Sequence, residues 1–75
     1  MQTIERYEQY SDGKFHLEET FNTDSPYWRV ENGAVYYILW DVYSSVYVEH
    51  SKRKMCMSEK EAVENNCGCY YKIKQ

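Results

Sequence analysis

The segment AVYYILWDVY, Ala34 to Tyr43, contains one charged residue, Asp41, and nine apolar or aromatic residues. Successive side chains of a β-strand point to opposite faces of its sheet. As a strand, this segment therefore places large apolar groups on both faces. The fold depends on what covers those two faces in a chain of 75 residues.

The residues around this segment predict tight hairpins. Asn32-Gly33 before it favours a type I′ turn, in which both central residues take positive φ. Ser44-Ser45 after it predicts a second hairpin into 46–50, in preference to a bulge in one long strand. The predicted register places Trp28, Val30, Val35, Tyr37 and Leu39 on one face, and Arg29, Glu31, Tyr36, Ile38, Trp40 and Val42 on the other. Residues 51–54 then read as a basic turn, and 55–57 as a short edge strand.

The N-terminal part predicts another hairpin, about residues 2–21, around the turn pair Asp12-Gly13. With a two-residue turn, Ile4, Tyr10, Phe15, Leu17 and Phe21 share one face, and the cross-strand pairs are Gln9/His16, Glu8/Leu17, Arg6/Glu19 and Ile4/Phe21. A helix over residues 2–10 is the alternative, since Ile4, Tyr7 and Tyr10 also recur every three residues. The stretch 22–26 reads as a loop.

A helix is predicted near the C-terminus, at about residues 59–66. Ser58 and Glu61 fit the S-x-x-E capping box, and the early glutamates suit the positive end of the helix dipole. Gly68 is the expected left-handed cap. A last strand follows at about 69–74. The sequence therefore predicts one α+β domain over residues 1–75. Its central sheet, at about 27–57, contributes to an antiparallel sheet or small, partly closed barrel of five or six strands.

The short helix leaves a problem of apolar coverage. Each large side chain left in water forgoes about 1.5–3 kcal/mol of burial energy, and a small domain has only about 5–15 kcal/mol of total stability. The second face of the central sheet can be covered by closure of the sheet, by another copy of the chain or by a different protein. The chain has nine tyrosines, whose hydroxyls need water or partners, so several rings must remain at the surface.

Three cysteines and a histidine could form a zinc site. Structural zinc takes four tetrahedral sulfur or nitrogen ligands, which Cys56, Cys67, Cys69 and His50 would supply. The spacing departs from the usual zinc patterns, because a single glycine separates one cysteine pair and no second pair matches it. The alternative is that the thiols are small buried apolar groups. We therefore expect no cofactor, with zinc as the alternative.

No catalytic motif is present in the sequence. His16 and His50 have no serine or cysteine at a familiar nucleophile spacing, and Glu18 and Glu19 fall on opposite faces of one strand. Each of the three glycines is explained by a turn or a cap, so no phosphate-binding loop remains. We expect a protein that is not an enzyme.

Nucleic-acid binding is the alternative function. Tyr36, Trp40, Tyr70 and Tyr71 could stack bases, and phosphates could be bound by Lys52, Arg53, Lys54, Lys72 and Lys74. The net charge of -3 argues against this, because phosphate binding needs a basic face.

Membrane insertion and export are not expected. The longest apolar run has about half the length of a membrane span, and MQTIERYEQY lacks the basic and apolar regions of a signal peptide. A cytoplasmic location is expected, where thiols stay reduced.

Protein binding is the leading functional prediction. Tyr36, Trp40, Tyr43 and Tyr47 would anchor a protein partner or a second copy in a homodimer. Asp41 and Glu49 would form an acidic rim that sets charge complementarity. In its general manner, this short, acidic, Tyr-rich chain of tight hairpins is similar to small accessory proteins of bacteriophages. The similarity covers no motif and carries over no residue. It implies a chain that binds and inhibits a host protein, in the host cytoplasm.

Overall fold

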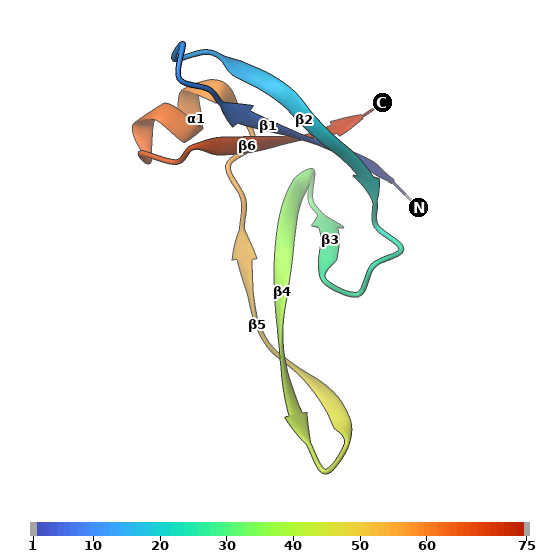
Figure 1. Ribbon diagram of the computed structural model, residues 1–75. Helices are drawn as coiled ribbons and strands as arrows, with labels where there is room; N and C mark the ends of the chain where they lie inside the picture. The colour runs from blue at the N-terminus through green and yellow to red at the C-terminus, as the bar shows by residue number, and fades with distance from the viewer. Residues whose placement is uncertain (1, 75) are drawn as a thin grey trace.

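The computed structural model describes residues 2–74 and consists of two three-stranded antiparallel sheets and one short helix (Figure 1). The first sheet has the order β2–β1–β6, with β1 at Thr3–Gln9, β2 at Phe15–Asn22 and β6 at Cys69–Lys74. The second has the order β3–β4–β5, with β3 at Trp28–Glu31, β4 at Ala34–Tyr43 and β5 at Val46–Lys54. The helix α1 is Glu59–Glu64. The predicted α+β class is confirmed, and over the described range the six strands form two open sheets, not a closed barrel.

The N-terminal hairpin keeps the predicted register at only one end. The pairs Ile4/Phe21 and Arg6/Glu19 are confirmed, whereas Gln9/His16 and Glu8/Leu17 are wrong and give way to Gln9/Phe15, Glu8/His16 and Tyr7/Leu17. The predicted helix alternative for this segment is wrong as well, since β1 is a strand.

The shift arises because the loop has three residues, Ser11–Gly13, and not two. The Tyr10 N–H donates to Lys14 O at 2.9 Å, and Gly13 has φ +82°. This matches a turn followed by a left-handed glycine. A bulge beyond Arg6 absorbs the difference.

The bulge moves two apolar side chains to the other face of the first sheet. Phe15 and Leu17 now share a face with Tyr7, opposite to that of Ile4 and Phe21. On this face the Tyr70 ring stacks on Tyr7, with ring centroids 4.9 Å apart, and meets the Phe15 ring edge-on. The residues predicted to share one face of this hairpin are therefore divided between its two faces.

The core lies between the two sheets. Ile4 and Val35 are fully buried and pack with Tyr71, and partly buried Phe21, Trp28, Val30, Met55, Met57, Cys69 and Ile73 surround them. The first sheet thus covers the Trp28–Val35 face of the central sheet, as the predicted register of β3 and β4 requires. Burial raises the pKa of the Tyr71 hydroxyl to about 12.

The helix begins at the predicted capping residue. Ser58 Oγ accepts from the Glu61 N–H at 3.1 Å, and Glu61 Oε1 accepts from the Met57 N–H. At the other end, the left-handed residue is Asn66, with φ +54°, and the prediction of Gly68 is wrong. The Cys67 N–H donates to Ala62 O, which is the Schellman arrangement.

The helix packs against β6. No helix among residues 2–74 is long and apolar enough to cross a membrane.

Both turns of the central sheet form as predicted. Asn32 and Gly33 have positive φ values of 51° and 74°, and Ser44 and Ser45 have values of 50° and 69°. The type I′ backbone matches the twist of the flanking strands, but the two serines occupy it at a steric cost. The predicted basic turn at 51–54 is wrong, because β5 continues to Lys54.

Candidate functional site

The outer half of the β4–β5 hairpin projects from the body of the molecule as a two-stranded arm. In Figure 1 it extends away from the first sheet and from β3. We call residues 39–51 the arm. β3 pairs with β4 up to Tyr37, and the Ile38 N–H donates to Tyr27 O. All of β5 is solvent-exposed, and the arm exposes six large apolar side chains: Leu39, Val42, Tyr43, Val46, Tyr47 and Val48.

The arm divides the predicted binding residues between two faces. Trp40 pairs with Glu49 and Val42 with Tyr47, so these four share a face with Tyr36. We call Tyr36, Trp40 and Tyr47 the aromatic face. The predicted residues Asp41 and Tyr43 lie on the opposite face, where they accompany Leu39, Val46 and Val48.

A register shift between Leu39 and Trp40 shapes this division. Leu39 pairs with Ser51 and Trp40 with Glu49, which leaves His50 as the extra residue of β5. Lys52 and Lys54 follow Glu49 by odd numbers of residues, so a regular strand would place them on the opposite face. Because of the extra residue, they lie on the same face as Glu49.

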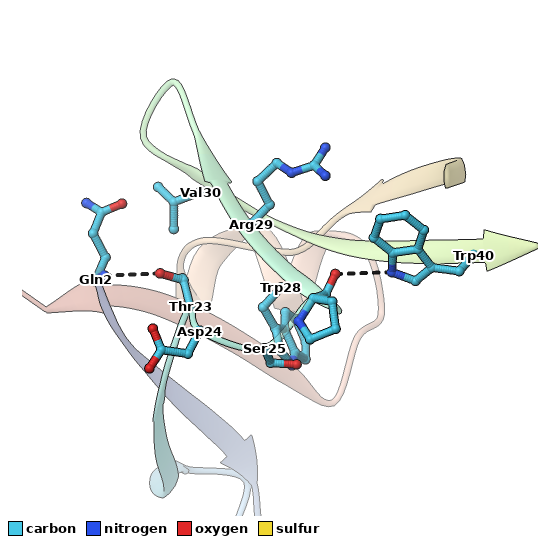
Figure 2. A pocket seen from close by; sticks show the side chains of 9 residues that line it. Gln2, Thr23, Asp24, Ser25, Trp28, Arg29, Val30 and Trp40 are labelled. Carbon is cyan, nitrogen blue, oxygen red and sulfur yellow. Dashed lines mark hydrogen bonds between the residues drawn. The ribbon is translucent and has the colours of Figure 1, made fainter. Parts of the chain in front are cut away.

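A small apolar hollow lies where the arm joins the body. It encloses about 210 Å³ and is lined by Pro26, Tyr27, Trp40 and Tyr47. The Trp40 indole N–H donates to Pro26 O at 3.1 Å, which fixes the indole against the loop before β3 (Figure 2). On the other side of Pro26, a wider hollow of about 480 Å³ lies between this loop, Trp28 and Trp40. Tyr47 forms the outer wall of the small hollow and is 69% exposed.

Ion pairs cover the base of the aromatic face. Arg29 lies 2.6 Å from Glu49 and 3.5 Å from Glu31, and Lys52 lies 2.7 Å from Glu31. The hydrogen bond from Lys52 lowers the pKa of Glu31, and the bond to Glu49 raises the pKa of Arg29. Beneath these groups the Ile38 side chain is only 1% exposed. The predicted acidic rim is thus neutralised at Glu49.

On the opposite face, Asp41 also has a basic partner. Its carboxylate lies 2.8 Å from His50 Nδ1, across the register shift. Both side chains are exposed. Both predicted rim carboxylates, Asp41 and Glu49, therefore contact a basic side chain of the arm or its base.

The four predicted zinc ligands do not come together. Cys56, Cys67 and Cys69 line one hollow of about 400 Å³ beside the base of β5, with Arg53, Lys54, Met55 and Tyr71. His50 lies in the arm. Among residues 2–74 no three His, Cys, Asp or Glu side chains are arranged to hold a metal ion. Burial, together with the neighbouring Cys67 thiol, raises the pKa of Cys56 to about 11, so this thiol stays neutral.

Sequence reasoning missed Pro26 and Tyr27 as members of the aromatic hollow. The register that pairs Trp28 with Tyr37 also predicts Tyr27 opposite Ile38, which lies two residues before Trp40 on the neighbouring strand. A proline next to a tyrosine at that position was the available signal, because aromatic and proline side chains together form apolar contact surfaces.

Comparison with known proteins finds no family model that matches this chain, and no similar curated protein or solved structure.

Proposed function

We propose that this chain is a non-enzymatic protein-binding module, and that the aromatic face and the hollow at the base of the arm receive an apolar side chain of its partner. The observation that carries the proposal is the hollow of Pro26, Tyr27, Trp40 and Tyr47. It presents three aromatic rings at an open surface. Tyr and Trp dominate binding energy at protein interfaces because they bring large contact areas at low entropy cost.

The arrangement of charge supports a protein partner over a nucleic acid. The cations on the side of the aromatic face already contact carboxylates: Arg29 contacts Glu49, Lys52 contacts Glu31 and Lys54 contacts Glu61. A phosphate backbone would have to compete with these carboxylates, whereas a mixed protein surface can exchange ion pairs with them.

The similarity in manner to small bacteriophage accessory proteins suggests the biological setting. In this proposal the chain acts in the host cytoplasm and inhibits a host protein by occupying its surface. The partner contributes an apolar side chain to the hollow and polar groups to the surrounding ion pairs.

Two matched variants test the proposal. Tyr47→Ser removes a wall of the hollow, and Tyr43→Ser removes an equally exposed ring from the opposite face of the same hairpin. The tyrosines are 69% and 63% exposed, so neither change disturbs the core. We expect a host protein captured from bacterial lysate by the wild-type chain to be retained by Tyr43→Ser and lost by Tyr47→Ser, with affinity reduced about 30-fold or more for a hot-spot residue.

Equal capture by both variants would contradict the proposed face. Titration of the chain with oligo-dT tests the alternative, which is binding of single-stranded nucleic acid. Binding that needs Tyr47 and weakens steeply with added salt would replace the protein partner with single-stranded nucleic acid.

A further inference from the structure

The outer edge of β5 is unpaired along its whole length within the described part of the chain. The strand is the last in the order β3–β4–β5, and β4 is the neighbour with which it pairs. Its nine residues are all exposed. A strand edge of this kind presents free N–H and C=O groups that can pair with another strand. The basic residues that discourage such pairing, Lys52–Lys54, occur only at the body end.

The arm also lacks the burial that normally supports a hairpin. A two-stranded ribbon is marginal in water by itself, and three or more strands with a covered apolar face are needed for stability. The arm exposes apolar residues on both of its faces. Another strand beside β5 would give the arm a third member.

We propose that β5 pairs antiparallel with β5 of a second copy of this chain, so that the two central sheets join into one six-stranded sheet. The proposal goes beyond the proposed function, because backbone groups along the edge of β5 make the contact, and not the hollow at the base of the arm. A twofold axis between His50 and Ser51 relates the two copies, as in most homodimers.

The charge along β5 selects this direction and register. A parallel arrangement would place Lys52–Lys54 beside the same basic residues of the other copy. The antiparallel register about the 50/51 axis instead places Glu49 opposite Lys52 of the second copy and Tyr47 opposite its Lys54. Within each copy Glu49 already contacts Arg29 and Lys52 contacts Glu31, so the contact between copies joins two existing ion pairs into one network of alternating charge. Residues directly opposite each other must share a sheet face. Tyr47, Glu49, Lys52 and Lys54 all share one face because of the extra residue at His50.

Apolar groups meet on the other face in the same register. Val46 falls opposite Met55 of the second copy, and Met55 lines the 400 Å³ hollow at the base of β5 and packs against the core. The exposed tip of each arm thus reaches the apolar hollow of the other copy. The joined strands and the two buried tips would bury on the order of 1,000 Å² in total, near the lower limit for a specific interface. We therefore expect a dimer of micromolar affinity.

The test measures the mass of the protein in solution, by sedimentation or light scattering, at protein concentrations from roughly 1 µM to 1 mM. We expect the wild-type mass to rise from 9.1 kDa toward twice that value. Glu49→Lys places like charges opposite Lys52 of the second copy, and Lys52→Glu places them opposite Glu49. Each variant alone should dimerise about tenfold more weakly or worse.

An equimolar mixture of the two variants gives the decisive result. In a Glu49→Lys/Lys52→Glu heterodimer both contacts between copies are again of opposite charge, so the mixture should recover the dimer that each variant loses. Glu64→Lys and Lys60→Glu make the same charge changes on α1, outside β5, and should leave the dimer unchanged.

A wild-type monomer across the whole range would overturn the inference, and the edge would then be open to a strand of another protein. Full dimerisation of the single variants, or no recovery in the mixture, would also overturn it. The mass measurements use chains that keep Tyr47, so a negative result in the Tyr47→Ser capture experiment does not affect them. The two proposals can therefore fail separately.

Discussion

The body and the arm share one strand, β4, but bury its side chains very differently. Val35, at the body end, is fully buried between the sheets, whereas Val42, in the arm, is 58% exposed. Around Val35, three aromatic rings and several aliphatic groups converge from both sheets. Val42 instead pairs with Tyr47 of β5, five residues beyond Tyr37, where the pairing of β4 with β3 ends.

This difference separates what stabilises the molecule from what is free to bind. The body holds the fully buried apolar side chains, and their burial supplies most of the folding free energy. The arm keeps its regular hydrogen bonding and its type I′ turn, yet leaves its apolar groups in water. Truncation of apolar side chains in the body should therefore alter stability, whereas truncation of those in the arm should mainly alter binding.

The largest expected effect tests this division directly. Val35→Ala and Val42→Ala remove the same atoms from the same strand. We expect the first to lower the free energy of unfolding by about 2–3 kcal/mol, from lost burial and the cavity left behind. The second should change it by less than about 0.5 kcal/mol, as at other surface sites. Urea denaturation at low protein concentration measures both, and equal losses would contradict the division.

Substitutions at the two turns should change the free energy of unfolding by a smaller amount, with opposite signs in the arm and the body. Ser45→Gly in the arm relieves a residue with φ +69°, and we expect a gain of about 1 kcal/mol. Gly33→Ser imposes the same strain where φ is +74°, and we expect a similar loss.

Thermal unfolding resolves these changes, since 1 kcal/mol shifts the melting temperature of a chain this size by about 4–8 °C. The space around Gly33 is open, so a loss there reports backbone strain and not a clash. Melting shifts of the same sign in the two variants would contradict this account.

The smallest expected effect concerns pH. The folded state raises the pKa of Cys56 to about 11 and that of Tyr71 to about 12. Both groups therefore stabilise the fold fully below their unfolded pKa values, about 8.5 and 10, and lose that contribution as the pH rises through the folded values. We expect the melting temperature to fall by a few degrees between pH 8 and pH 10.5.

Cys56→Ser separates the thiol from the phenol, because serine does not titrate in this range. We expect its melting temperature to depend less on pH than that of the wild type over the same interval. An identical dependence would show that Cys56 does not contribute.

Much of the fold could be predicted from local signals in the sequence. Asn32-Gly33 predicted its turn correctly, and the register of β3 and β4 followed from it. Ser58 and Glu61 predicted the start of the helix. Signals of this kind act within four residues, so they do not depend on distant parts of the chain.

The errors in the fold arose where alternation was ambiguous. A bulge reverses the faces of the residues before it relative to those after it, but the sequence shows no sign of it where both possible faces contain apolar groups. The alternation in the sequence therefore predicts the wrong face for Phe15 and Leu17, which precede the bulge in β2. The charge of residues 51–54 predicts a turn, but β4 extends far enough to pair with them.

The candidate site was predicted less completely than the fold. The spacing of Tyr36 and Trp40 predicts a shared face, and the structure places them so. Tyr43 and Asp41 are separated from this pair by the same alternation. The side chains that contact Glu49 and Asp41 belong to residues 20 and 9 positions away, and only the folded register brings them near.

The extra residue in β5 makes chain length, and not composition alone, a constraint on the arm. His50 allows the tip and the base of β5 to present Tyr47, Glu49, Lys52 and Lys54 on one side. With one residue fewer, tip and base could not both keep their present faces, although every other side chain would remain. Relatives of this chain should therefore accept many changes of side chain along the arm, but few changes of a single residue in its length.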